Sequence, residues 1–294
     1  MKTIPFSAPD INDDDLKAVE SVIRSGWLAH GKYSERLEEL FCEYTGAEYA
    51  TTVSNCTAGL HLSCLTAGFG PGDEVIVPAQ THTATAHAVE FTGAKAVFAD
   101  VDPLSGNILL NEIERKLTNY TKGVIPVYMA GHPCAMKEIN RFCNVNNLML
   151  IEDSAQALGG EYKGKKLGTF GDVGSFSFDA GKTLHTGEGG IIITDNKDLY
   201  DKAAEFSDHG HMHEPNLARG LDPRRMKGLN LRMSELTAAI GIAQLNKIDF
   251  ILSESKKNKE YIKSHLLGIP NISFREFSDE GGSQGDTLIF NLSN

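Results

Sequence analysis

The stretch of the chain from residue 173 to 194 reads VGSFSFDAGKTLHTGEGGIIIT. It begins and ends with short apolar runs, 173–178 and 190–194, whose length and composition are typical of buried β-strands. A glycine-rich loop connects the two runs and carries one lysine, Lys182. The stretch therefore predicts two strands of a sheet, with a lysine held at the end of the first one.

The sequence around this stretch alternates short strand-like runs with helix-like runs from about residue 45 to 195. The other predicted strands are 49–53, 74–78, 95–99, 123–127 and 148–152. The predicted helices are 57–67, 82–91, 108–117 and 135–146, and two more precede the block, one of them over 14–24 with an apolar stripe at Leu16, Val19, Val22 and Ile23. Such alternation is the signature of an α/β fold with a mostly parallel sheet.

The alternation ends after residue 195, where a polar loop over 207–227 follows. An apolar stretch, 233–249, predicts a buried helix, and its polar continuation over 252–264 predicts one long helix that leaves the core. Two strand-like runs, 272–277 and 287–292, come last. We therefore expect a large domain over 1–250 and the start of a smaller α+β domain over 251–294. Because the sequence stops directly after a strand pattern, the second domain is either minimal or incomplete.

Composition narrows the class of protein. The 294 residues include 28 basic and 39 acidic side chains, and the formal charge of −11 argues against nucleic-acid binding. No apolar run approaches the roughly 18 residues that span a bilayer, and residues 1–15 show no secretory signal. The five cysteines form no Cys-x-x-Cys pair, which excludes the usual disulfide and thiolate-zinc patterns. We expect a cytoplasmic protein that binds neither nucleic acid nor membrane.

The first candidate site is residues 54–60, SNCTAGL, which follow a predicted strand and open a predicted helix. The start of a helix offers unpaired N–H groups and a positive dipole end, so it binds phosphate readily. Thr57 could add a hydroxyl. A simple helix cap by Ser54, Asn55 or Thr57 is the alternative, and these residues alone favour it.

The second candidate is Asp153, directly after the strand at 148–152, with Gln156 three residues further on. Ligands of α/β proteins bind at the carboxyl ends of strands, where a carboxylate can face a buried cation. A helix cap is again the alternative.

The third candidate is Lys182. A lysine acts as a nucleophile only when its pKa falls well below the usual value of about 10.4, and partial burial beside cationic groups lowers it in this way. A solvated lysine in a glycine loop is the alternative.

Together these residues supply a phosphate cradle, a carboxylate for a protonated ring nitrogen and an amine for a Schiff base. Pyridoxal phosphate requires this combination. The carboxylate keeps the ring electron-withdrawing, and the lysine returns as a general acid and base. The sequence therefore predicts a pyridoxal phosphate enzyme.

These motifs closely resemble the DegT/StrS family of sugar aminotransferases, which have the fold type I architecture of pyridoxal phosphate enzymes. The resemblance runs from about Pro5 to Asp249, and residues 182–190 are its most specific part. It implies a large domain with a mostly parallel seven-stranded sheet flanked by helices, and relatives that continue past residue 294. We therefore expect a truncated small domain.

The resemblance also implies the roles of individual residues. Lys182 is implied to bind the cofactor covalently, and Asp153 to pair with the ring nitrogen. The other implied cofactor contacts are Cys56, Thr57 and Ser177 at the phosphate, Gln156 near the ring hydroxyl, and His82 on the ring face. Cys56 stands where relatives usually have glycine, and His82 where they usually have an aromatic residue that covers more of the ring. Residues 228–233, GLNLRM, match the segment whose asparagine, here Asn230, reaches the phosphate of the neighbouring subunit. This implies a homodimer.

The implied activity is transfer of an amino group from L-glutamate to a keto sugar, for surface polysaccharide or lipopolysaccharide synthesis. Family dehydratases carry histidine in place of the lysine, so Lys182 favours amino transfer. Nucleotide-linked keto sugars are the first expectation for the substrate. Residues 206–211, 228–230 and 272–276 also resemble the branch that aminates position 8 of an octulosonate, which is the second expectation. A non-catalytic regulator that binds the cofactor is the alternative function.

The remaining candidates concern the substrate and a metal. His185, His209, Arg219, Arg224 and Arg225 are the candidate substrate-binding residues. The arginines could pair with a diphosphate or a sugar-acid carboxylate through forked hydrogen bonds, and a solvated basic loop is equally compatible. His209, His211 and His213 are spaced by two, which would place them on one face of an extended segment. A histidine cluster in a polar loop is more often not a metal site, and we expect no metal.

Overall fold

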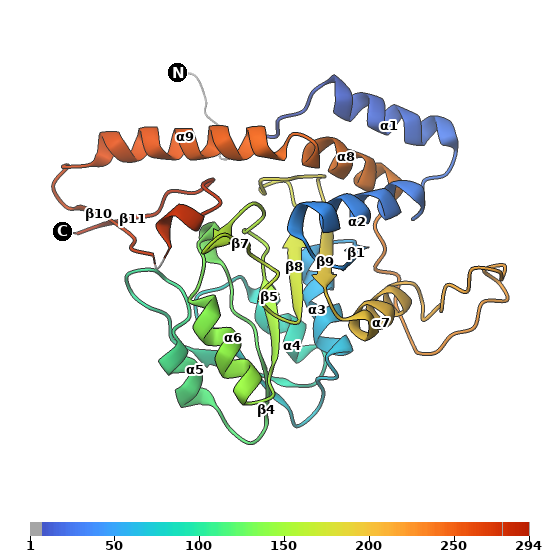
Figure 1. Cartoon of the computed structure of the whole chain (residues 1–294), viewed down its shortest axis with the longest axis horizontal. Coiled ribbons are helices and arrows are strands. Elements are labelled where there is room, and N and C mark those ends of the chain that lie inside the picture. The colour runs from blue at the N-terminus through green and yellow to red at the C-terminus, as the bar shows by residue number, and fades with distance from the viewer. Residues whose placement is uncertain (1–7, 278, 294) are drawn as a thin grey trace.

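The computed structural model describes residues 8–277 and 279–293, so Pro5 lies outside the described residues. Its centre is a seven-stranded sheet in the order β1-β9-β8-β5-β4-β2-β3 (Figure 1). Strand β9 is antiparallel to both of its neighbours, and the other pairs are parallel. The bounds are β1 (Tyr49–Val53), β2 (Glu74–Pro78), β3 (Lys95–Ala99), β4 (Thr121–Val124), β5 (Met149–Asp153), β8 (Val173–Ser177) and β9 (Gly190–Thr194). The predicted mostly parallel seven-stranded sheet is confirmed.

Helices cover both faces of this sheet. The described α-helices are α1 (Asp13–Ser25), α2 (Lys32–Thr45), α3 (Cys56–Thr66), α4 (Thr83–Glu90), α5 (Leu110–Lys116), α6 (Met136–Val145), α7 (Lys197–Ser207), α8 (Glu235–Leu245) and α9 (Ile248–Leu266), of which α1 packs on α8. Side chains alternate between the two faces along each strand. In β9, Ile191 and Ile193 join the core formed with α2 and α8, whereas Ile192 joins the core with α7. Burial on both sides explains why these strands are continuously apolar.

Helix α1 shows how local sequence signals set the bounds of an element. The side chain of Asn12 accepts a hydrogen bond from the amide of Asp14 at 2.9 Å, and Gly26 ends the helix with a φ of 74°. The apolar stripe predicted on this helix does not form a fully buried face. Val22 is buried, but Leu16 and Ile23 are 63% and 59% exposed.

The single long helix predicted over 233–264 is instead two helices, α8 and α9. The chain leaves helical geometry at Lys247, whose φ is −112°. Its ammonium group lies 2.9 Å from the Asp15 carboxylate in α1, and Gln244 donates to the same carboxylate at 2.7 Å. The break therefore coincides with the contact that ties the end of α8 to α1.

The last elements are small. Strands β10 (Ile272–Phe274) and β11 (Phe290–Leu292) form an antiparallel pair, shorter than predicted. Between them lies the short helix η2 (Glu280–Gly282), after which the Gln284 amide donates to the carbonyl of Gly131 in η1 (Met129–Gly131) at 3.1 Å. A second small hairpin joins β6 (Glu161–Tyr162) to β7 (Lys165–Lys166). The domain boundary near residue 250 stays a prediction. None of the described helices has the length and apolar character needed to cross a membrane.

Gly190 allows β9 to pass close to the start of α3. A Cβ atom at this position would lie 2.7 Å from backbone atoms of Asn55 and Cys56. We predict that Gly190→Ala lowers the free energy of unfolding by about 1–3 kcal/mol, because the start of α3 must move. Gly70→Ala is the matched control, since nothing lies within 4 Å of the added Cβ. Urea denaturation measures both, and equal values for the two variants would contradict this account.

Candidate active site

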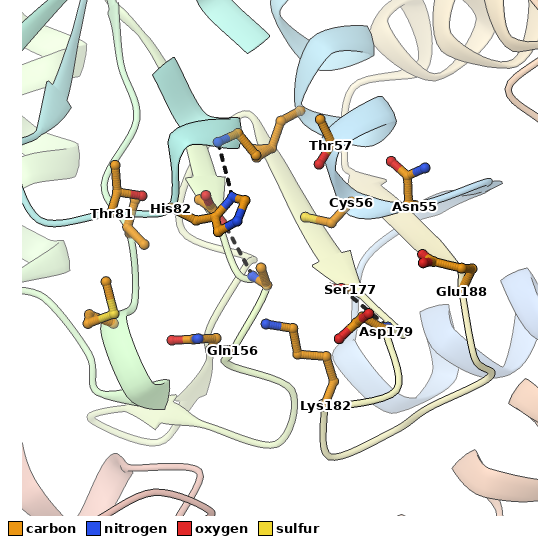
Figure 2. A pocket seen from close by; sticks show the side chains of 16 residues that line it. Asn55, Cys56, Thr57, Thr81, His82, Gln156, Ser177, Asp179, Lys182 and Glu188 are labelled. Atoms are coloured by element: carbon orange, nitrogen blue, oxygen red, sulfur yellow. Dashed lines mark hydrogen bonds between the residues drawn. The ribbon is translucent and has the colours of Figure 1, made fainter. Parts of the chain in front are cut away.

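A cavity of about 630 Å³ opens at the carboxyl edge of the parallel strands. Figure 2 shows the side chains that surround it. The polar lining comes from the segments that follow β1, β2, β5 and β8, because parallel strands end at one edge of the sheet. Seven of the predicted site residues line it together: Cys56, Thr57, His82, Asp153, Gln156, Ser177 and Lys182.

Helix α3 points its first turn at the cavity. Asn55 is its N-cap, and the side chain of Asn55 accepts a hydrogen bond from the Ala58 amide at 2.8 Å. Cys56 and Thr57 follow and line the cavity, so the cap by Asn55 leaves the helix start open to a ligand, and a phosphate site there stays a prediction. The Cys56 sulfur lies 3.3 Å from the Ser175 hydroxyl, and burial raises the pKa of the Cys56 thiol. The thiol therefore stays protonated at neutral pH.

Asp153 is the last residue of β5, and only 4% of it is exposed. No helix follows it, so the helix-cap alternative is wrong. One carboxylate oxygen accepts a hydrogen bond from the Thr85 hydroxyl at 2.7 Å, and the other from the Ala155 amide at 3.2 Å. Burial raises the pKa of Asp153, and the Thr85 hydrogen bond is the largest opposing effect. Such a carboxylate becomes fully ionised when a cation is placed beside it.

Gln156 lies beside Asp153 on the cavity wall. Its side-chain oxygen accepts a hydrogen bond from the Ala130 amide at 2.7 Å. Ala130 has a φ of 54°, a left-handed conformation that a residue other than glycine rarely adopts. The bond fixes the Gln156 carbonyl, so its NH₂ group is the part that can donate to a ligand.

The Lys182 side chain reaches into the cavity between Gln156 and Ser177 (Figure 2). The loop that carries it is held by its own backbone, because the Lys182 amide donates to the Asp179 carbonyl at 2.9 Å. The next residue, Thr183, donates to Asp286 at 3.1 Å and accepts from the Gln284 amide group. The half-buried lysine therefore projects from a braced loop into the cavity.

His82 and Ser177 complete the predicted part of the wall. His82 is the N-cap of α4, and its Nδ1 atom accepts from the Ala84 amide at 3.1 Å. The accepting role leaves the proton of a neutral imidazole on Nε2. The Ser177 hydroxyl accepts from the Asp179 amide at 3.3 Å, which leaves its own proton free to donate to a ligand.

Sequence reasoning missed several residues of the site. Among those that line the cavity are Asn55, Thr81, Met129, Asp179 and Glu188. Asp179 and Glu188 lie in the stretch 173–194 together with Lys182, so their closeness to the lysine in the sequence could have identified them as site residues. Thr85 and Asp286 gave no such signal, because each acts on a residue that lies far away in the sequence.

The five candidate substrate residues do not line this cavity. His185 is buried behind Lys182, and its Nδ1 atom lies 2.8 Å from the Lys182 carbonyl oxygen. Three others lie in the loop between α7 and α8, which projects from the body of the molecule (Figure 1), and they bond to residues of this loop or of the end of α7. Arg219 bonds to Asp208, Arg225 to Glu205, and Arg224 to His211. The loop is thus held by ion pairs, and the substrate contacts of these residues and of His209 stay predictions.

The side chains of the three histidines of the same loop do not share a common partner. His211 lies 3.0 Å from Asp222, His213 lies 3.4 Å from Asp208, and His209 has a φ of 59°. Within the described part of the chain, no three His, Cys, Asp or Glu side chains are grouped so that they could hold a metal ion.

The fold and the cavity define a class of protein. A mostly parallel sheet carries a lysine, a buried carboxylate and a helix N-terminus around one cavity. Asp153 takes part in no ion pair of the described residues, so its buried carboxylate is available to a cationic group of a ligand. The residues present fit pyridoxal phosphate, and the class is that of fold type I pyridoxal phosphate enzymes.

The chain belongs to the DegT/DnrJ/EryC1/StrS aminotransferase family, whose model matches residues 9–289. It is 38% identical over 279 residues to the GDP-perosamine synthase of Escherichia coli O157:H7, covering 92% of this chain and 74% of that protein. The structure of the aminotransferase TlmJ from Streptoalloteichus hindustanus superposes with a TM-score of 0.94 at 30% identity, covering 99% of this chain and 79% of the other. The structure of E. coli GDP-4-keto-6-deoxy-D-mannose-3-dehydratase with bound hydrated PLP superposes at 0.92 and 27% identity, covering 100% and 80%.

These similarities confirm the predicted family, the fold type I architecture and the pyridoxal phosphate cofactor. The protein is a pyridoxal phosphate-dependent sugar aminotransferase.

The contact between Asp286 and Thr183 connects the end of the chain to the Lys182 loop. We predict that Asp286→Ala weakens pyridoxal phosphate binding severalfold, because Thr183 and Gln284 lose a shared acceptor. Thr287→Ala is the control, since it removes only an exposed donor to the other oxygen of Asp286. Titration of the visible absorbance of the cofactor measures both affinities. An Asp286→Ala protein that binds as tightly as its parent would show that the brace is dispensable.

Proposed function

We propose that this protein transfers an amino group from L-glutamate to a nucleotide-linked keto sugar, for the synthesis of a surface polysaccharide. The observation that carries the proposal is the Lys182 side chain in the same cavity as the buried Asp153 carboxylate. The names of two similar proteins, a GDP-perosamine synthase and a GDP-4-keto-6-deoxy-D-mannose-3-dehydratase, support a nucleotide-linked sugar. A cytoplasmic location stays a prediction.

Pyridoxal phosphate, when bound, supplies an aldehyde that accepts an amino group and a ring that stabilises negative charge on the neighbouring carbon. Asp153 would keep a proton on the ring nitrogen, because a buried carboxylate stabilises an adjacent cation. The Nζ atom of Lys182 would hold the group in the cavity and then move the proton between carbon atoms as a general base and acid. Thr57, Ser177 and the first amides of α3 would bind the phosphate.

The choice between amino transfer and dehydration depends on position 182. Lysine has an amine that can both attach the group and return a proton, and the family resemblance assigns histidine to the dehydratases. Lys182 lines the cavity, which supports amino transfer. A non-catalytic regulator that binds the cofactor could use the same amine for attachment, so the assay of amino transfer from L-glutamate separates the two functions.

We predict that the enzyme loaded with cofactor releases at most one 2-oxoglutarate per site from L-glutamate alone, and turns over continuously only when a suitable keto sugar is present to accept the amino group. The test is a panel of nucleotide-linked 4-keto sugars and an 8-keto octulosonate, with the amino sugar detected by mass spectrometry. Lys182→Ala should lower turnover by roughly 10³-fold or more. Lys137→Ala, an exposed lysine on α6, should match the parent. Unchanged turnover in Lys182→Ala would refute the assignment, and conversion of the octulosonate alone would replace the proposed substrate.

We also propose a homodimer in which Asn230 serves the cavity of the neighbouring subunit. Asn230 is exposed and does not line the cavity of its own chain, and its side-chain oxygen accepts from Arg232 at 2.9 Å. The next residue, Leu231, accepts from the amide of Ser54, close to the start of α3. The exposed apolar side chains of Leu16, Ile23 and Trp27 on and after α1 offer surface for a partner.

Mixed dimers test this proposal. Lys182→Ala and Asn230→Ala are each expected to be impaired, but a mixed dimer contains one cavity with both residues intact if Asn230 acts across the interface. We predict that refolding the two variants together restores activity to about a quarter of the parent value. If Asn230 acted within its own subunit, both cavities of the mixed dimer would be defective and activity would not return.

A further inference from the structure

We propose that Thr85 is the positioning residue for Asp153, and that Thr81 and Thr85 form a directed pair of hydroxyl groups that hold this carboxylate toward the ring nitrogen of the cofactor. The inference rests on the proposed function, because it assigns Asp153 to that nitrogen.

The first turn of α4 brings the two threonines together. Thr81 precedes the N-cap His82, and Thr85 lies one turn later, so their hydroxyl groups approach to 2.6 Å. Thr85 is fully buried and is absent from the cavity lining, whereas Thr81 lines the cavity. Thr85 therefore stands behind Asp153 as seen from the ligand.

The direction of these hydrogen bonds follows from the number of protons. An ionised carboxylate only accepts, so the Thr85 hydroxyl must donate its single proton to Asp153, across 2.7 Å. The 2.6 Å contact must then be donated by Thr81. The order is Thr81 to Thr85 to Asp153. Donation by Thr81 polarises the Thr85 hydroxyl and strengthens its bond to the carboxylate.

The threonine pair is important for the pKa of Asp153, because the groups around this buried carboxylate shift its pKa in opposite directions. Burial raises its pKa, while the bonds from Thr85 and Ala155 and the charge of Lys182 lower it. The Cys56 thiol, which also faces it, is neutral. One hydroxyl donor on one oxygen and one amide on the other fix the carboxylate plane. Lone pairs of both oxygens remain for the ligand, because two donors do not exhaust a carboxylate.

The substitution that tests this role is Thr85→Val, which keeps the shape of the side chain and removes the donor. We expect the Thr85→Val apoprotein to bind pyridoxal phosphate about tenfold more weakly. Because Asp153 loses a donor that lowers its pKa, the decline of binding on the acid side should move to higher pH by about one unit. Thr85→Ser keeps the hydroxyl and should restore both the affinity and the pH profile. Thr81→Val should weaken binding by about threefold.

The measurements are the visible absorbance of the bound cofactor, titrated between about pH 5 and 9, and thermal denaturation of each apoprotein. Thr45→Val is the matched control, because Thr45 is buried in α2 and its hydroxyl donates only to the Phe41 carbonyl, at 2.7 Å. Thr45→Val should leave affinity and pH profile unchanged. If Thr85→Val does not fold, Thr81→Val is tested in its place. A Thr81→Val protein with the affinity and pH profile of the parent would refute the proposed pair of hydroxyl groups.

Failure of this inference differs from failure of the proposed function. If the parent aminates a keto sugar and Thr85→Val binds the cofactor with the parent affinity and pH profile, Thr85 has no positioning role and the proposed function stands. Loss of affinity without a change in the pH profile would show a merely structural role and would also overturn the inference. If no keto sugar is aminated but the Thr85 series shows the expected affinities and profiles, the positioning role stands and the proposed function falls.

Discussion

The burial of one negative charge at the end of β5 is the constraint on which the site depends. A carboxylate taken out of water is unstable unless donors or a cation compensate it. Thr85 and Ala155 supply two donors to Asp153 within the protein. They leave part of the cost uncompensated, and a cationic ring nitrogen would remove it if Asp153 has the role proposed above. The binding energy of the cofactor and the stability of this part of the sheet are therefore linked.

The alternation of side chains along β5 gives the strand two buried carboxylates with different tasks. Asp153 faces the cavity, whereas the preceding residue, Glu152, points to the opposite face. Glu152 accepts hydrogen bonds from the Tyr128 hydroxyl and from the amides of Gly168 and Gly171. It thereby fixes the loop that leads into β8. The loop before β8 is thus fixed by a carboxylate that lies one residue away from Asp153.

The Lys182 loop is also braced from the far end of the chain. Gln284 and Asp286 meet at Thr183, and the Gln284 backbone meets Gly131, next to the residue that holds Gln156. The loop of the Lys182 amine and the segment that holds the Gln156 amide are therefore both contacted by the small C-terminal segment. This arrangement gives the short β10–β11 part of the chain a direct influence on the geometry of the cavity.

The sequence by itself determined the strands and the alternation that makes the fold, and its local signals singled out Thr57, Asp153, Gln156 and Lys182 in the cavity. These signals are strand composition, a glycine loop, and a polar residue at the end of an apolar run. Cys56, His82 and Ser177 were implied by the family resemblance. Only the tertiary structure decided which distant residues form hydrogen bonds with one another. Thr85 meets Asp153 across 68 positions, Asp286 meets Thr183 across 103, and Arg219 bonds to Asp208 rather than facing the cavity. Hydrogen-bond partners of this kind are chosen by the packing of distant elements, and residue spacing does not record that packing.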